Sequence, residues 1–167
     1  DVDALARRLM EWALNPAYLK QLLPMLQPRL ERLSDVGQFA DYFLAGHITL
    51  TPEQLAHKKL DAEQVKRNLV WAMWRFDQLS AWETTLIEAS LRESAELLEV
   101  KLRDFLASFY PALTGKKSAT PLFDTMQVLG RDLTRARLRD AIEVLGGLSK
   151  MQEARWKKEF EAQSPNA

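Results

Sequence analysis

Residues 112–142 hold the densest group of side chains that could contact an anion. Four polar residues form a loop: Lys116, Lys117, Ser118 and Thr120. The loop ends at Pro121, a residue suited to the first turn of a helix. The free amides and the positive dipole end of such a turn favour a negative ligand, and the two lysines reinforce this preference.

Four arginines follow the loop within nine residues: Arg131, Arg135, Arg137 and Arg139. Residues four apart share a helix face, so Arg131, Arg135 and Arg139 lie together, whereas Arg137 points elsewhere and is placed to pair with an acid. Like charges at this spacing destabilise a helix by a few tenths of a kcal/mol, and a bound phosphate would relieve the repulsion. The pattern favours RNA or phosphate contact, with plain solubility as the alternative.

The distribution of charge supports the same interpretation. The chain of 167 residues has no net charge, but residues 1–100 carry a charge of −4 and residues 101–167 a charge of +4. Such an asymmetry suggests that the second half faces an anionic partner. Tyr110 comes directly before Pro111 and the polar loop, where we expect its ring to stay accessible.

Catalytic and metal-binding patterns are absent from the sequence. There is no cysteine, and none of the common nucleotide-binding, nucleophile-elbow or zinc-protease motifs occurs. Glu53 and His57 have a spacing that could hold a metal on a helix, but a single pair is weak, so we assign neither a catalytic nor a metal site. No apolar run is long enough to span a membrane.

The elements that must position these residues are helices, because apolar residues recur at three- and four-residue steps nearly throughout. Val65, Leu69, Ala72 and Phe76, for example, predict one face of a long helix that opens at Asp61. Thr51-Pro52-Glu53 predicts the start of a short helix, and Ser80 with Glu83 matches a capping box that would open another. We find no strand pattern, so the predicted class is all-α.

The stretch 110–145 resembles the C-terminal anticodon-binding region of bacterial-type glutamyl-tRNA synthetases. The resemblance is carried by four short motifs in the family's order and spacing: Ala112-Leu113-Thr114-Gly115, Pro121-Leu122-Phe123, Leu129-Gly130-Arg131, and Arg137-Leu138 with Ala141. Tyr110 departs from the family pattern, which has an arginine there that helps to sense the last anticodon base. A tyrosine can stack on a base but lacks the arginine's fork of donors, so discrimination would work differently.

The resemblance covers residues 1 to about 147 and implies an α-helical cage of two small subdomains. Residues 1–60 would lie toward the anticodon stem, 61–147 would enclose the anticodon bases, and 148–167 would form a charged helical tail, partly disordered. It adds one anticodon arginine, Arg29, with Arg32 as its rival. The tRNA-binding residues expected on all grounds are Arg29, Arg32, Tyr110, Thr114, Gly115, Lys116, Lys117, Ser118, Thr120, Arg131, Arg135 and Arg139.

The resemblance also implies a partner and a parent enzyme. This piece would bind tRNA, glutamate tRNA first and glutamine tRNA second, with no DNA and no membrane, in the cytoplasm. It would catalyse nothing and need no cofactor, whereas the parent chain would join glutamate to tRNA with ATP and Mg²⁺ in another domain. Two alternatives stay open, the helical cage of a class I lysyl-tRNA synthetase and a helical protein-interaction module.

Overall fold

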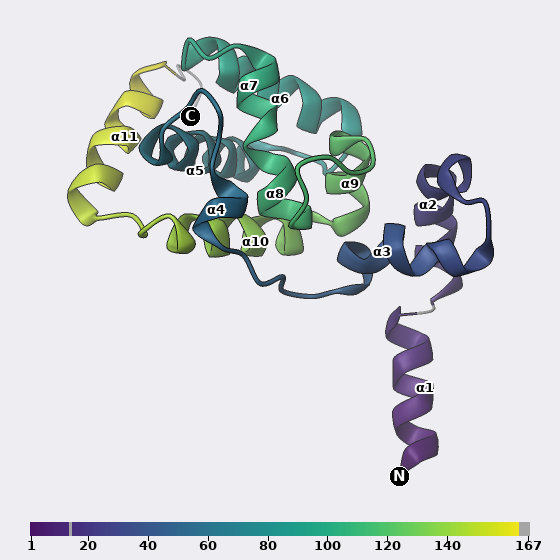
Figure 1. Cartoon of the computed structure of the whole chain (residues 1–167). Helices are drawn as coiled ribbons and strands as arrows, with labels where there is room; N and C mark the ends of the chain where they lie inside the picture. The colour runs from purple at the N-terminus through teal and green to yellow at the C-terminus, as the bar shows by residue number, and fades with distance from the viewer. Residues whose placement is uncertain (14, 164–167) are drawn as a thin grey trace. The chain divides into compact units, whose positions relative to one another are not determined.

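A computed structural model gives the structure of residues 1–13 and 15–163. Over this range the chain is helical and has no β-strand, which confirms the predicted all-α class (Figure 1). The elements in chain order are α1 (Val2–Ala13), α2 (Pro16–Leu26), the short 3₁₀ turns η1 (Gln27–Arg29) and η2 (Leu33–Asp35), α3 (Val36–Leu44), α4 (Pro52–Leu55), α5 (Ala62–Gln78), α6 (Thr84–Leu97), α7 (Leu102–Ala107), α8 (Phe109–Thr114), α9 (Leu122–Leu129), α10 (Arg131–Val144) and α11 (Lys150–Gln163).

The chain divides into two compact units, and the first is Asp1–Gly46. In this unit α2 packs against α3. Leu22 and Leu26 of α2 are buried, and the Tyr18 hydroxyl donates a hydrogen bond of 3.0 Å to the Phe43 carbonyl of α3. The first unit therefore has a small apolar core of its own.

The second unit, His47–Ala167, is organised around α5. This helix packs against α6 and α10, while α6 also contacts α9 and α10 contacts α8 (Figure 1). Val65, Leu69, Ala72 and Phe76 are all buried, which confirms the predicted apolar face. Their three- and four-residue spacing places them on one stripe of α5, and burying that stripe holds the helix in the middle of the unit.

The segment 47–60 belongs to the second compact unit, and the boundary predicted at residue 60 between the two functional subdomains stays a prediction. Three side-chain contacts attach it. His47 Nδ1 lies 2.6 Å from Asp140 Oδ2, the Gln54 amide donates to the Gly115 carbonyl at 3.3 Å, and Lys59 pairs with Asp104. No sequence pattern reports such long-range pairs. The assignment of the parts to anticodon stem and anticodon bases stays a prediction.

The C-terminal segment is an integral helix of the second unit. α11 buries Trp156 and Phe160, and the Phe160 ring lies 5.4 Å from the rings of both Trp71 and Trp74 on α5. Glu159 adds an ion pair of 2.6 Å to an arginine of α5. The predicted charged helical tail is therefore a helix, but its apolar side completes the core. The part predicted to be disordered, 164–167, lies outside the described residues.

Candidate nucleic-acid interface

The bend between α8 and the polar loop is built by Thr114 and Gly115. Gly115 has φ +70°, a left-handed conformation that glycine adopts without the penalty of a Cβ. The buried Thr114 hydroxyl donates to the Tyr110 carbonyl at 2.7 Å and accepts from the Lys116 amide at 3.2 Å. Thr114 thus fixes the exit of the loop from inside the fold, and its predicted contact with tRNA has no exposed hydroxyl to support it.

Arg137 of α10 stabilises this bend through a buried hydrogen bond. Its side chain is fully buried, and one guanidinium nitrogen donates to the Leu113 carbonyl at 2.6 Å. The carbonyls of the last turn of a helix lack partners within the helix, so a buried arginine is a strong donor for one of them. As the sequence predicted, Arg137 lies off the face shared by the other arginines. The predicted partner was an acid, whereas the hydrogen bond described here is to a backbone carbonyl at the end of α8.

The loop itself presents two exposed residues, Lys117 and Ser118, beside a half-buried Lys116. Thr120 is different, because it is buried and its hydroxyl lies 2.6 Å from the Thr125 hydroxyl of α9. That contact closes the loop onto α9, so we correct the predicted RNA contact of Thr120 to a structural role. Tyr110 lies in α8 and is half-buried, and the accessibility of its ring stays a prediction.

The predicted trio of arginines on α10 does not form a free cationic face. Arg131 donates to the Leu79 carbonyl at 2.8 Å and lies over the Trp82 ring, and Arg135 forms a 2.9 Å ion pair with Asp77. Both side chains thus hold α10 against the end of α5. Arg139 is exposed, and its side chain makes no hydrogen bond or ion pair to another residue within 1–13 and 15–163. Of the three, it alone keeps its charge available in the part described.

Arg29 and Arg32 lie in the first unit, and both are exposed. Arg29 ends the turn η1, and Arg32 comes directly before η2, where its backbone amide donates to Asp35 at 2.8 Å. Their positions leave both guanidinium groups open to a ligand, and nothing in the first unit distinguishes the two. Which of the two contacts the anticodon therefore stays a prediction, with Arg29 first and Arg32 as the alternative.

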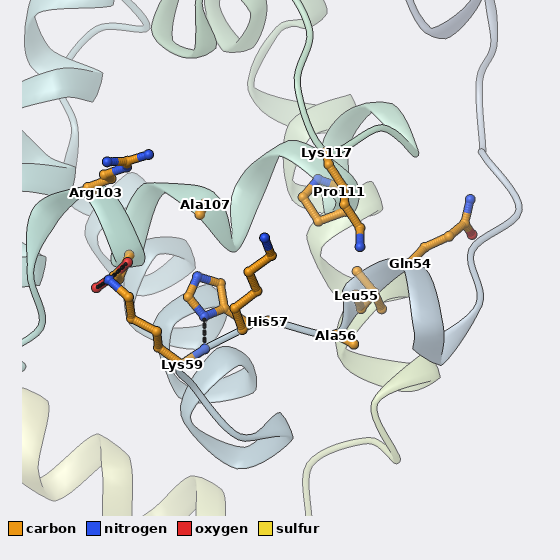
Figure 2. A pocket seen from close by; sticks show the side chains of 11 residues that line it. Gln54, Leu55, Ala56, His57, Lys59, Arg103, Ala107, Pro111 and Lys117 are labelled. Carbon is orange, nitrogen blue, oxygen red and sulfur yellow. Dashed lines mark hydrogen bonds and ion pairs between the residues drawn. The ribbon is translucent and has the colours of Figure 1, made fainter.

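A pocket that the sequence did not predict lies next to the polar loop. It has a volume of about 540 Å³ and is lined by the segment after α4, by α7 and by Lys117 of the loop (Figure 2). Arg103 of α7 and the consecutive His57, Lys58 and Lys59 also line it. The basic run 57–59 was the one available signal, but the sequence does not show that it meets residues of α7 and the loop.

The proposed pairing of Glu53 with His57 on one helix is not seen, because α4 ends at Leu55. Instead, His57 Nδ1 accepts backbone amide hydrogens from Lys59 and Leu60, each at 3.1 Å. A nitrogen that accepts is unprotonated, so the ring proton of the neutral histidine lies on Nε2. Within the described residues, no group of three or more His, Cys, Asp or Glu side chains could hold a metal ion.

Asp104 is the acidic group of this pocket. Lys59 Nζ donates to both of its carboxylate oxygens at 2.9 Å, and this hydrogen bonding lowers the pKa of Asp104 below its ordinary value. The carboxylate therefore stays ionised at neutral pH and neutralises one of the lysines. The other basic residues of the pocket are left with their charge.

Comparison with known proteins identifies the family of this chain. Residues 4–142 match the model of the family described as "Anticodon binding domain". The chain belongs to this family. The matched range includes the Thr114–Gly115 bend, the polar loop, the arginines of α10 and the whole lining of the pocket.

Several similar proteins with curated names are glutamate–tRNA ligases. One from Marinomonas sp. (strain MWYL1) is 40% identical over 158 residues, covering 95% of this chain and 32% of that protein. Those from Pseudomonas aeruginosa (strain UCBPP-PA14) and Stutzerimonas stutzeri (strain A1501) are each 40% identical over 157 residues, 94% of this chain and 32% of theirs. The chain thus spans about a third of these relatives and matches their C-terminal part. The lysyl-tRNA synthetase alternative is not favoured.

Proposed function

We propose that this anticodon binding domain holds the anticodon loop of glutamate tRNA as the C-terminal part of a glutamate–tRNA ligase. The proposal is carried by the match of nearly the whole chain to the C-terminal part of such ligases. Glutamine tRNA is the second candidate, because Tyr110 replaces the arginine that helps related domains to sense the last anticodon base. The parent would join glutamate to tRNA in the cytoplasm using ATP and Mg²⁺.

The geometry around the bend supports a role in contacting RNA. Lys117 and Ser118 stand exposed on a loop that Thr114 and Thr120 fasten at its two ends. A fixed loop loses little conformational freedom when a strand binds, so its contacts contribute more to affinity. The lysine supplies charge for a phosphate, and the hydroxyl is a donor and an acceptor for sugar or base.

Tyr110 supplies the aromatic surface of this proposal. The residue is half-buried next to the bend, and an accessible aromatic ring can stack on an unpaired base for about 1–3 kcal/mol. Stacking is tolerant of sequence, so a tyrosine at this place favours binding of an anticodon base without selecting strongly between C and G. Discrimination between glutamate and glutamine tRNA then depends on other contacts.

In this proposal ATP and Mg²⁺ belong to the parent enzyme's other domain. We derive no step of the ligation reaction from this domain. Its part in the reaction is recognition, which means binding and orienting the tRNA. No helix within the described residues is long and apolar enough to cross a membrane.

The test is equilibrium binding of the purified chain to glutamate, glutamine and lysine tRNAs over a series of salt concentrations. We expect the glutamate tRNA to bind most tightly, the glutamine tRNA next, and all binding to weaken steeply with salt because phosphate contacts release counterions. A glutamate tRNA with a replaced anticodon loop should bind less tightly. Equal affinity for the native and replaced loops would refute anticodon binding, and preference for the lysine tRNA would refute the glutamate assignment.

A further inference from the structure

The pocket beside the polar loop carries more positive charge than its surroundings neutralise. Its lining contains four cations, Lys58, Lys59, Arg103 and Lys117, and one carboxylate, Asp104. Because Lys59 is bound to Asp104 on both oxygens, three cations are left. We call these three residues the cationic trio, and the net charge of the lining is +3 with the histidine neutral.

The side chains of the cationic trio, Lys58, Arg103 and Lys117, make no hydrogen bond or ion pair with another described residue, and all three residues are exposed. In this they differ from Arg131 and Arg135 on α10, which are used within the fold. In Figure 2, Arg103 and Lys117 stand at different sides of the hollow with the His57 ring between them. Three unpaired cations around one concavity repel one another, and an anion in the hollow would relieve that repulsion.

His57 adds a neutral donor to the same hollow. Its Nδ1 is occupied by the backbone amides of Lys59 and Leu60, and Figure 2 shows the bond to Lys59. The ring orientation is therefore fixed, and Nε2–H is the group that remains to donate. A fixed N–H donor beside lysine and arginine side chains suits the oxygens of a phosphate group, which accept several hydrogen bonds at once.

The rest of the lining argues for phosphate rather than for a base. Apart from His57, the uncharged residues of the lining are Gln54, Leu55, Ala56, Ala107 and Pro111, and no Phe, Tyr or Trp lines the pocket in the described residues. A base would find no aromatic ring to stack on. The Gln54 amide is already engaged, because its nitrogen donates to the Gly115 carbonyl at 3.3 Å and its oxygen accepts from the Thr51 amide at 2.8 Å. The positively charged side chains of the lining, by contrast, require only anionic oxygens as partners.

We propose that this pocket binds backbone phosphates of the tRNA, on the strand that passes from the polar loop toward α7, with Lys58 and Arg103 as phosphate ligands. The inference rests on the proposed function and deepens it. Lys117 belongs both to the loop and to the pocket, so a strand on the loop passes the pocket without a break. Contacts of this kind hold the strand in position and are independent of sequence.

The test is a double variant, Lys58→Ala with Arg103→Ala, in the full chain, which leaves the polar loop intact. Each lost phosphate contact lowers the magnitude of the slope of log affinity against log salt by about 0.7–0.9. We therefore expect a slope that is smaller in magnitude by about 1.4–1.8, a weakening of the binding of all tRNAs by the same factor, and an unchanged ratio between the affinities for glutamate and lysine tRNA. Lys58→Arg with Arg103→Lys keeps the charges and should keep the slope.

The matched control is Lys150→Ala with Lys158→Ala, which removes two positive charges from exposed positions of the second unit outside the pocket, neither side chain forming an ion pair within the described residues. We expect its slope to stay that of the unchanged chain. If the control and the pocket variant lower the slope equally, the effect is one of overall charge and the inference fails. If the pocket variant instead lowers the ratio between the two tRNAs at an unchanged slope, the pocket reads bases and the inference fails.

A titration with inorganic phosphate at constant ionic strength separates the two sources of a phosphate group. Competition between inorganic phosphate and tRNA that disappears in the pocket variant supports the RNA site. Phosphate binding that disappears while tRNA binding is unaffected shows a site for a small anion, and the inference fails. If the unchanged chain binds glutamate tRNA with selectivity but the pocket variant does so equally well, the proposed function stands and this inference alone is refuted.

Discussion

Replacement of Arg137 by methionine tests whether the bend is supported from inside the fold. Methionine has a similar length but no donor, so Arg137→Met leaves the Leu113 carbonyl buried without its 2.6 Å partner. A hydrogen bond to a charged group contributes about 1.5–3 kcal/mol, and an unsatisfied buried carbonyl costs about 1–3 kcal/mol. Burying a guanidinium is itself costly, which offsets part of the loss.

We expect the free energy of unfolding of Arg137→Met to fall by about 2–3 kcal/mol, and its Tm to fall by about 2–4 °C for each kcal/mol. The assay is urea unfolding followed by tryptophan fluorescence, which reports mainly on the second unit because four of the five tryptophans lie there. Amide hydrogen exchange at residues 114–118 should also become faster, because the end of α8 has lost its support.

Arg139→Met is the matched control, two residues further along the same helix and exposed. A surface substitution of this kind should change the free energy of unfolding by no more than about 0.5 kcal/mol. Equal destabilisation by the two variants would refute the argument, since it would mean that the buried contact of Arg137 contributes nothing beyond helix propensity. Unchanged exchange at residues 114–118 in a destabilised Arg137→Met would refute its link to the bend.

Two further outcomes follow from the packing and the charges. Phe160→Ala removes a fully buried ring that contacts two tryptophans of α5, and it should lower the free energy of unfolding in urea by about 3–5 kcal/mol. Met151, on the same helix, is 82% exposed, so Met151→Ala should leave the free energy of unfolding nearly unchanged. Similar losses in the two variants would show that α11 does not complete the core. Asp104→Asn tests the lowered pKa. Because the folded pKa lies below the ordinary 3.8, the ionised carboxylate stabilises the fold above that pH, and this contribution is lost as the pH falls through the folded pKa. The difference in urea midpoint between the unchanged chain and the variant should therefore be present at neutral pH and shrink well below 3.8, and a difference independent of pH would contradict the assignment.

Local signals predicted the helix starts best where one turn of chain supplies both partners. Thr51 caps α4 with Gln54, and Asp61 caps α5 with Gln64, as the residue types indicate. The capping box expected at Ser80 is wrong, because α6 begins at Thr84. There the first amide donates to Gln127 of α9 at 2.7 Å, a distant partner that replaces the local one.

The candidate site was predicted in part for the same reason. The exposed Lys117 and Ser118 lie in the polar loop that the sequence predicted, whereas the positive φ of Gly115 was not predicted. Helical spacing places Arg131 and Arg135 on the same face of α10, but both side chains are bound to other parts of the fold and are not available to a ligand. Their partners, the Leu79 carbonyl and Asp77, come from the end of α5, and only tertiary structure brings them within reach.

The packing of α11 on α5 has a consequence for the order in which the protein can fold during its synthesis. The ribosome makes α5 before α11, so the apolar surface that Trp156 and Phe160 cover remains exposed to solvent while the intervening helices are synthesised. Nascent chains with uncovered grooves of this kind are open to chaperones and to aggregation. The second unit therefore acquires its full cooperativity late, when the segment beyond the family's matched range has left the exit tunnel.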